Sequence, residues 1–210
     1  MPKKVLIYGS GEEAQLVVAM LKQRRYKKRF VVVGYKDDAR RVFTLNGLPV
    51  RKSLSEFDFD HLILAITNKA TMRLQDLAAL SEFVVTPIPV IDQTARISAN
   101  AITTQSVIIH KRVTIDHGTY LADFVIVKDD TKIGERVTVG EYTTIGCGCE
   151  IKDGVKIGRG CTIGDHVTLD AWIKIGNRVR VTDGSLLTSD AKNDGLYTGR
   201  PAMHAGVSKK

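Results

Sequence analysis

The sequence predicts an α/β unit with a parallel sheet over residues 1–88, followed by a parallel β-helix domain over residues 89–210. Three observations predict this division. Strand-like and helix-like segments alternate in the first part, helix signals end at a Pro-Ile-Pro segment, and aliphatic residues then recur every six positions. A pattern that changes its period at one point indicates two domains of different architecture.

The first 88 residues alternate between the two kinds of element. Because helical segments separate the strands along the chain, we expect a parallel sheet with helices on its faces, equivalent to half of a dinucleotide-binding Rossmann fold. The Asn46-Gly47 pair predicts a turn before a short extended segment. The expected strands are residues 5–8, 30–35, 61–66 and 83–86, and the expected helices are residues 12–23 and 71–80.

The period of six runs from Ile91 to Leu187. Sixteen of these seventeen positions are aliphatic, and each residue four places further on is small or β-branched. Two inward residues per hexapeptide suit a triangular prism, in which each hexapeptide forms one face and eighteen residues complete a coil. Glycine often follows the aliphatic residue, as at Gly134 and Gly140, and we interpret it as the residue of a tight corner.

The formal net charge is +8, and nine Lys or Arg lie between Lys22 and Arg41. We interpret them as a solvated helix end and loop. An alternative is attraction to an anionic ligand such as a nucleotide diphosphate. Nucleic-acid binding is not expected, because no recognised module or interleaved aromatic residues accompany the charge.

Neither a membrane segment nor a disulfide framework is expected. The chain has no apolar run long enough to span a bilayer, so we predict no membrane insertion. The three cysteines, Cys147, Cys149 and Cys161, favour a reducing, cytoplasmic location. Cys147 and Cys149 would point to opposite faces of a strand, and the histidines show no metal spacing, so no metal is predicted.

Motifs in both parts resemble one family. These are VLIYGSG at residues 5–11, VVGYKDD at residues 32–38, NGLPV at residues 46–50, and a closing Gly-x-Pro-Ala motif within residues 198–202. Their order resembles the two-domain sugar O- and N-acetyltransferases of bacterial surface-glycan synthesis, the sialic acid and bacillosamine acetyltransferase group.

The resemblance implies a left-handed β-helix that forms a homotrimer, with acetyl-CoA in the groove between neighbouring prisms. It also implies acyl transfer from the CoA thioester to a nucleotide-linked amino sugar held by the α/β domain. Two alternatives stay open. One is a sugar-nucleotide-binding or scaffold protein that has lost catalysis, and the other is O-acetylation of a free sugar acid.

A glycine turn between the first strand and helix is the expected substrate site. Its residues Gly9, Ser10 and Gly11 would bring backbone N–H groups and a helix N-terminus to a diphosphate. Asp37 and Asp38 could accept hydrogen bonds from a base or ribose, although a plain turn is an equal alternative.

The same turn departs from the family pattern. Glu12 and Glu13 stand where the family often has Gly and His, and two carboxylates oppose a phosphate. This departure leaves the pose of the nucleotide open.

The reaction needs a base and a hydrogen-bond donor for the oxyanion. The family uses a histidine in the β-helix, usually followed by an acidic residue. The local motif places it at His117, whereas counting back from the closing motif places it at Glu135. These positions differ by one eighteen-residue coil, so we expect them to stack about 4.8 Å apart, with Asp153 next.

We therefore predict His117 as the base and Glu135 as the carboxylate that orients it. The alternative is that both are solvated residues of a surface that has lost catalysis. The family also holds CoA with a second histidine, but the corresponding counts reach Ile126 and Thr144, so that contact is lost or replaced here. The residues expected to contact CoA are Thr144, Gly146, Asp153 and Gly164.

Overall fold

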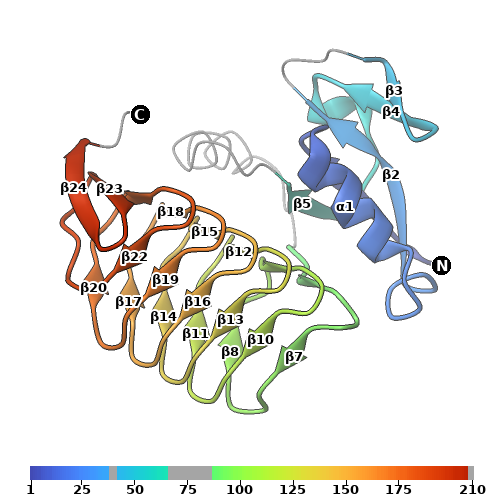
Figure 1. The fold of residues 1–210 in the computed structure, drawn as a ribbon. Coiled ribbons are helices and arrows are strands. Elements are labelled where there is room, and N and C mark those ends of the chain that lie inside the picture. Colours follow the sequence, from blue (N-terminus) through green and yellow to red (C-terminus); the bar gives the residue numbers. More distant parts are fainter. Residues whose placement is uncertain (38–41, 66–86, 208–210) are drawn as a thin grey trace. The chain divides into compact units, whose positions relative to one another are not determined.

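A computed structural model of the chain describes residues 1–37, 42–65 and 87–207. Two compact units, Met1–Val90 and Ile91–Lys210, divide the chain, and each is described by itself (Figure 1). The expected helix at residues 71–80, the expected strand at residues 83–86 and Asp38 lie outside the described residues.

The N-terminal unit contains a five-stranded sheet in the order β3-β4-β2-β1-β5. Strand β1 runs parallel to both β2 and β5, which confirms the predicted parallel sheet. A hairpin turn at Asn46 and Gly47, with φ of 52° and 75°, joins the antiparallel pair β3 and β4. The strands are β1 (Lys3–Tyr8), β2 (Phe30–Lys36), β3 (Thr44–Leu45), β4 (Leu48–Arg51) and β5 (His61–Leu64), and a short 3₁₀ helix, η1, spans Leu54–Glu56.

Helix α1 (Glu12–Leu21) follows β1 and packs against β2. Its buried residues include Ala14, Val17, Val18 and Leu21, a spacing that places them on one face of a helix. The helix ends two residues before the expected boundary at Gln23. No described helix is long and apolar enough to cross a membrane.

The C-terminal unit is a parallel β-helix with three sheets. Paired strands are eighteen residues apart, as Thr114 with Lys132 and Ile115 with Ile133 show, so the predicted coil length is confirmed. The first sheet joins β7 (Arg96–Ile97), β10 (Thr114–Ile115), β13 (Lys132–Ile133), β16 (Glu150–Ile151), β19 (Thr168–Leu169) and β22 (Leu186–Leu187). The second joins β8 (Ile102–Thr103), β11 (Tyr120–Leu121), β14 (Thr138–Val139), β17 (Lys156–Ile157) and β20 (Lys174–Ile175).

The third sheet is the longest and ends in an antiparallel hairpin, β23 with β24. It joins β6 (Val90–Ile91), β9 (Ile108–Ile109), β12 (Ile126–Val127), β15 (Thr144–Ile145), β18 (Thr162–Ile163), β21 (Arg180–Val181), β23 (Gly195–Gly199) and β24 (Ala202–Val207). Tyr197 of β23 is buried in the apolar core at this end of the prism.

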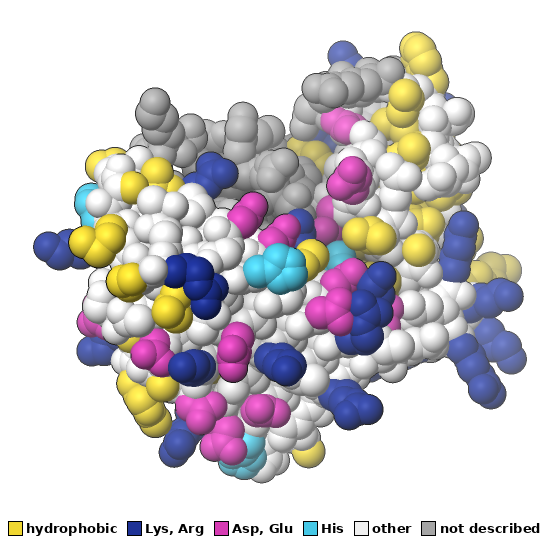
Figure 2. Space-filling view, in the orientation of Figure 1, with side chains coloured by type: hydrophobic (Ala, Val, Ile, Leu, Met, Phe, Trp, Pro, Cys, Tyr) yellow, Lys and Arg dark blue, Asp and Glu magenta, His cyan; other side chains and the backbone are white. Residues whose placement is uncertain are grey.

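Aliphatic side chains fill the interior of the prism. The smaller inward residues are buried beside them, and their polar groups bond to neighbouring coils. For example, the Thr131 hydroxyl donates to the Gly146 carbonyl at 2.7 Å and accepts from the Cys149 N–H at 3.2 Å. Charged side chains lie on the outside of the coils (Figure 2).

The glycines that follow the aliphatic residues begin the turns, but they do not hold the left-handed position of the corner. The left-handed corner residues lie three places after the aliphatic residue, as at Gly118, Arg136 and Gly154. Gly140 is needed for another reason, since a Cβ there would lie 2.7 Å from the Arg159 backbone nitrogen of the next coil. Glycine at this position therefore permits the close approach of successive coils.

Candidate functional site

The glycine turn after β1 is fixed to the end of β2. Gly9 has φ of 111°, a conformation that favours glycine, and its N–H donates to the Lys36 carbonyl at 2.8 Å. Gly11 is the N-cap of α1, and a Cβ there would meet nothing within 4 Å. Only Gly9 is therefore required by the backbone conformation of this turn.

Ser10 and Asp37 come together at the carboxyl ends of β1 and β2. The Ser10 hydroxyl donates to the Asp37 carboxylate, and the Asp37 N–H donates to the Arg51 carbonyl at 2.9 Å. Strand β1 lies between β2 and β5, so the strand order reverses direction here. Open α/β sheets bind ligands at such a switch point, outside the carboxyl ends of the strands.

The first turn of α1 is acidic, as the sequence indicates. Glu12 is exposed and Glu13 is buried. These carboxylates suit the positive end of the helix dipole, and they also reduce its attraction for a phosphate.

A buried lysine at the end of β2 was missed by the sequence reasoning. The Lys36 ammonium donates to the Tyr8 hydroxyl at 2.7 Å and lies 4.0 Å from the centroid of the Tyr8 ring. It places a buried positive charge at the end of β2, one residue before Asp37. The only signal in the sequence is a lysine directly before the Asp37-Asp38 pair.

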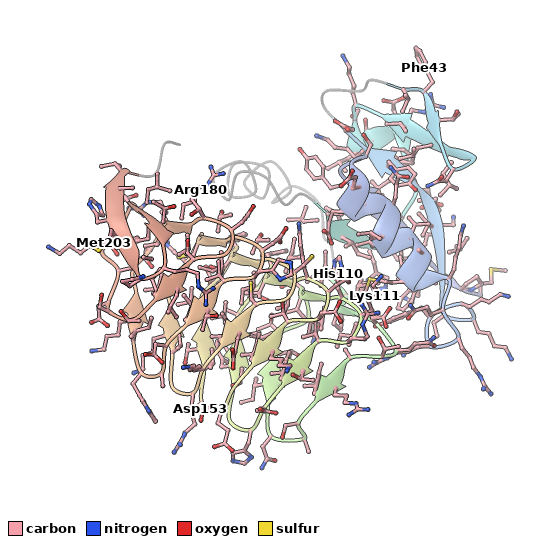
Figure 3. The ribbon with its side chains drawn as sticks, in the orientation of Figure 1. Phe43, His110, Lys111, Asp153, Arg180 and Met203 are labelled. Carbon is pink, nitrogen blue, oxygen red and sulfur yellow. The ribbon has the colours of Figure 1, made fainter. Side chains whose placement is uncertain are left out.

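A corner of the β-helix holds the predicted catalytic residues. The Arg136 N–H donates to the His117 carbonyl at 2.9 Å, and the Gly154 N–H donates to the Glu135 carbonyl at 2.8 Å. His117, Glu135 and Asp153 therefore occupy equivalent positions in successive coils. They lie in the turns between the first and second sheets. Asp153 is labelled at the edge of the coils (Figure 3).

The side-chain neighbour of His117 at this corner is Asn100, whereas the sequence predicted Glu135. The His117 Nδ1 lies 3.2 Å from the Asn100 side-chain nitrogen, in the preceding coil. The Glu135 carboxylate lies 3.9 Å from the Arg136 guanidinium, and the Asp153 carboxylate accepts the Glu135 N–H at 2.8 Å. The orientation of His117 by Glu135 stays a prediction.

The same corner exposes an aromatic residue next to a cation. Trp172 is 62% exposed, and the Arg136 guanidinium carbon lies 5.3 Å from its ring centroid. The ring covers Gly154, where a Cβ would lie 2.5 Å from a ring carbon. Because Arg136, Gly154 and Trp172 are spaced by eighteen residues, the sequence contained the signal for this column.

The expected CoA contacts do not gather at one corner of a single chain. Gly146 and Gly164 begin the turns after β15 and β18, and Thr144 is buried on β15. Asp153 lies in the next corner along the chain, between β16 and β17. Their contact with CoA stays a prediction.

A buried histidine lies beside a carboxylate elsewhere in the β-helix. The Nδ1 atom of the buried His110 lies 3.4 Å from an oxygen of Asp129, and the Lys111 ammonium lies 3.3 Å from the other oxygen (Figure 3). The described residues contain no group of three or more side chains suited to a metal ion.

Comparisons with known proteins agree with the two-part fold. Residues 136–171 match the family described as bacterial transferase hexapeptide (six repeats). No curated protein sequence matches the chain. A mutant of perosamine N-acetyltransferase from Caulobacter crescentus, solved in complex with CoA and GDP-perosamine, is 21% identical with a TM-score of 0.88, and the match covers 97% of both chains.

Two other solved structures are similar over nearly their whole length. The acetyltransferase domain of PglB from Neisseria gonorrhoeae, in complex with acetyl coenzyme A, is 20% identical with a TM-score of 0.86, covering 97% of this chain and 100% of that one. WeeI from Acinetobacter baumannii is 19% identical with a TM-score of 0.86, covering 95% and 98%. The β-helix thus carries the bacterial transferase hexapeptide repeat, and the whole chain shares the fold of these acetyltransferases.

Proposed function

We propose that the chain is an acetyl-CoA-dependent N-acyltransferase that acts on a nucleotide-linked amino sugar, as a homotrimer in the cytoplasm. One observation carries this proposal. The fold matches perosamine N-acetyltransferase over 97% of both chains, and that structure contains CoA and GDP-perosamine. The hexapeptide repeat match within residues 136–171 supports the same reaction class.

The switch point of the N-terminal sheet is the proposed nucleotide site. Asp37 accepts hydrogen bonds from the ribose or base, and Lys36 supplies a positive charge near the diphosphate. The turn at Gly9 presents backbone N–H groups. This division of roles explains how a turn followed by Glu12 and Glu13 could still receive an anionic ligand.

His117 is the proposed general base. The neutral sugar amine attacks the thioester carbon, the carbon–sulfur bond breaks, and the amine proton passes to the imidazole while CoA leaves as the thiol or thiolate. A base nitrogen needs a free lone pair. Because Nδ1 lies beside Asn100, we assign the base role to Nε2, and the imidazole proton then lies on Nδ1. The Asn100 amide fits this tautomer once its carbonyl, rather than its nitrogen, faces Nδ1.

Glu135 is the proposed carboxylate partner in the next coil, about 4.8 Å along the prism. A carboxylate near an imidazole favours the imidazolium that forms when the amine proton is transferred. The exposed Trp172 ring, three coils from His117 or about 14 Å along the prism, would suit the adenosine phosphate end of CoA together with the Arg136 guanidinium beside it.

An assay of CoA thiol release tests whether His117 and Glu135 take part in catalysis. Wild-type protein and the variants His117→Ala and Glu135→Ala are assayed with acetyl-CoA and UDP-, dTDP- and GDP-linked amino sugars. Loss of a general base lowers kcat by about 10²-fold or more, so we expect that loss for His117→Ala. His166→Ala is the matched control, since His166, like His117, is an exposed residue in a turn of the β-helix.

The outcome also distinguishes catalysis from the alternative function, which is binding of the sugar nucleotide without catalysis. If the sugar nucleotides raise the melting temperature of the protein but no thiol is released, the chain is a binding protein that has lost catalysis. If His166→Ala loses as much activity as His117→Ala, the assigned base is wrong.

A further inference from the structure

The turn between α1 and β2 carries a concentrated positive charge that the proposed reaction does not use. Residues 22–29, here called the basic turn, contain six cationic side chains and no acidic one. All six are exposed, and none forms an ion pair within the described part of the chain. They are Lys22, Arg24, Arg25, Lys27, Lys28 and Arg29.

The backbone of the basic turn is held in place. The Tyr26 N–H donates to the Gln23 carbonyl at 2.9 Å, and the Arg29 N–H donates to the Tyr26 carbonyl at 2.7 Å. Tyr26 is 4% exposed, and its hydroxyl donates to the Pro89 carbonyl at 3.2 Å. The charges are therefore presented by an ordered turn. Lys and Arg side chains gather at this end of the N-terminal unit (Figure 2).

A cavity of about 280 Å³ lies directly beside the basic turn. Val18 and Leu21 of α1, Val32 of β2 and Leu48 of β4 supply apolar walls, while Lys22 and Lys27 line the cavity as well. An apolar cavity next to unpaired cations suits a ligand that has both an apolar part and an anionic part.

This site is separate from the nucleotide site. The Lys3 N–H bonds to the Arg29 carbonyl at the start of β1, whereas the Gly9 turn follows its end. The six residues of β1 therefore separate the two sites by about 20 Å. The sequence raised the alternative that the basic turn attracts the nucleotide diphosphate. That attraction would have to act over this distance of about 20 Å.

We propose that the basic turn and its cavity dock the chain on a bilayer surface that carries anionic phospholipid headgroups. The cations face the headgroup phosphates, and the cavity receives an apolar group of the lipid. The exposed Val31, 44% accessible, adds apolar surface beside the cavity. A nucleic-acid partner is disfavoured, because Tyr26 is buried and offers bases no face on which to stack. Such docking requires no membrane insertion.

Vesicle flotation tests this proposal with the full chain. We expect the wild type to float with phosphatidylcholine vesicles that contain phosphatidylglycerol, to ignore pure phosphatidylcholine, and to be released by high salt. The double variant Lys22→Glu with Lys27→Glu should bind at least about tenfold more weakly. Lys132→Glu with Lys156→Glu, two exposed strand residues of the β-helix, makes the same change in net charge and should bind like the wild type.

Three results would overturn the proposal. The first is equal binding of the wild type to vesicles with and without phosphatidylglycerol. The second is a loss of vesicle binding in the β-helix control as large as in the Lys22→Glu with Lys27→Glu variant. The third is displacement of the protein from vesicles by a short oligonucleotide that it binds more tightly. If the glutamate variant fails to fold, Arg24→Ala with Lys28→Ala replaces it, because both side chains are exposed. Wild-type flotation with unchanged binding of this second variant would equally refute the assignment.

Discussion

At the scale of single residues, the period of the sequence predicted in which coil a residue lies, but not which side chains it contacts. The spacing of eighteen residues placed His117 and Glu135 in adjacent coils, and the structure has them there. It could not predict that Asn100 lies 3.2 Å from the imidazole, because side-chain orientation at a corner depends on rotamers and local contacts. Lys36 was missed because its contact with the Tyr8 hydroxyl also depends on side-chain orientation.

The Asn100 contact leads to a prediction about pH dependence. Asn100→Asp places a carboxylate next to His117 Nδ1, which favours the imidazolium and raises the pKa of the proposed base above that in the wild type. The acidic limb of the profile of kcat/KM against pH should therefore move to higher pH. Asn100→Leu, which keeps a similar volume without a hydrogen bond, should lower activity without that shift. An unchanged profile in Asn100→Asp would remove His117 from the reaction.

The interior cysteines predict how stability depends on pH. Burial raises the pKa of the Cys149 and Cys161 thiols to about 11, from an ordinary value of 9.0. A raised pKa means that folding favours the neutral thiol, so this stabilisation is complete below pH 9 and is lost as the pH rises through 11.

We expect the free energy of unfolding to fall by roughly 2 kcal/mol per thiol near pH 11. Denaturant unfolding of the wild type and of Cys149→Ala with Cys161→Ala, compared across this range, isolates the effect. The difference between the two proteins should shrink with rising pH. A constant difference would show that the thiols do not titrate in this way.

At the scale of the structural element, the repeat could be recognised while the role of its glycines could not. Periodicity identifies which residues face inward, because that depends only on the pattern of apolar residues. It does not report how closely successive coils approach. The left-handed corner positions are held by Arg136, Tyr142 and Trp172 as well as by glycines, so residue type alone did not mark them.

The close approach of coils makes Gly140 a sensitive position. Gly140→Ala puts a Cβ 2.7 Å from the Arg159 nitrogen, and the backbone there cannot yield without disturbing the ladder. We expect a loss of about 2–3 kcal/mol in unfolding free energy, measured by chemical denaturation. Gly11→Ala is the control, because a Cβ there meets nothing within 4 Å, and it should cost about 1 kcal/mol or less. Equal losses in both variants would contradict the packing argument.

At the scale of the whole molecule, an α/β unit with a largely parallel sheet precedes a stack of repeated coils. The sequence was sufficient to predict both architectures, since each has its own period. It was not sufficient to predict the catalytic competence of the corner, because a histidine and a carboxylate one coil apart can catalyse or simply be solvated. In the proposed reaction, their chemistry depends on a substrate amine and a thioester meeting at that corner.

Mass spectrometry of the reaction product tests the central claim most directly. The chain is incubated with acetyl-CoA and a nucleotide-linked amino sugar, and the product is fragmented to locate the added acetyl group. We expect one acetyl group on the sugar nitrogen, formed together with an equal amount of free CoA thiol. Acetylation on a hydroxyl oxygen, or of a free sugar acid without its nucleotide, would contradict N-acyl transfer to a nucleotide-linked substrate.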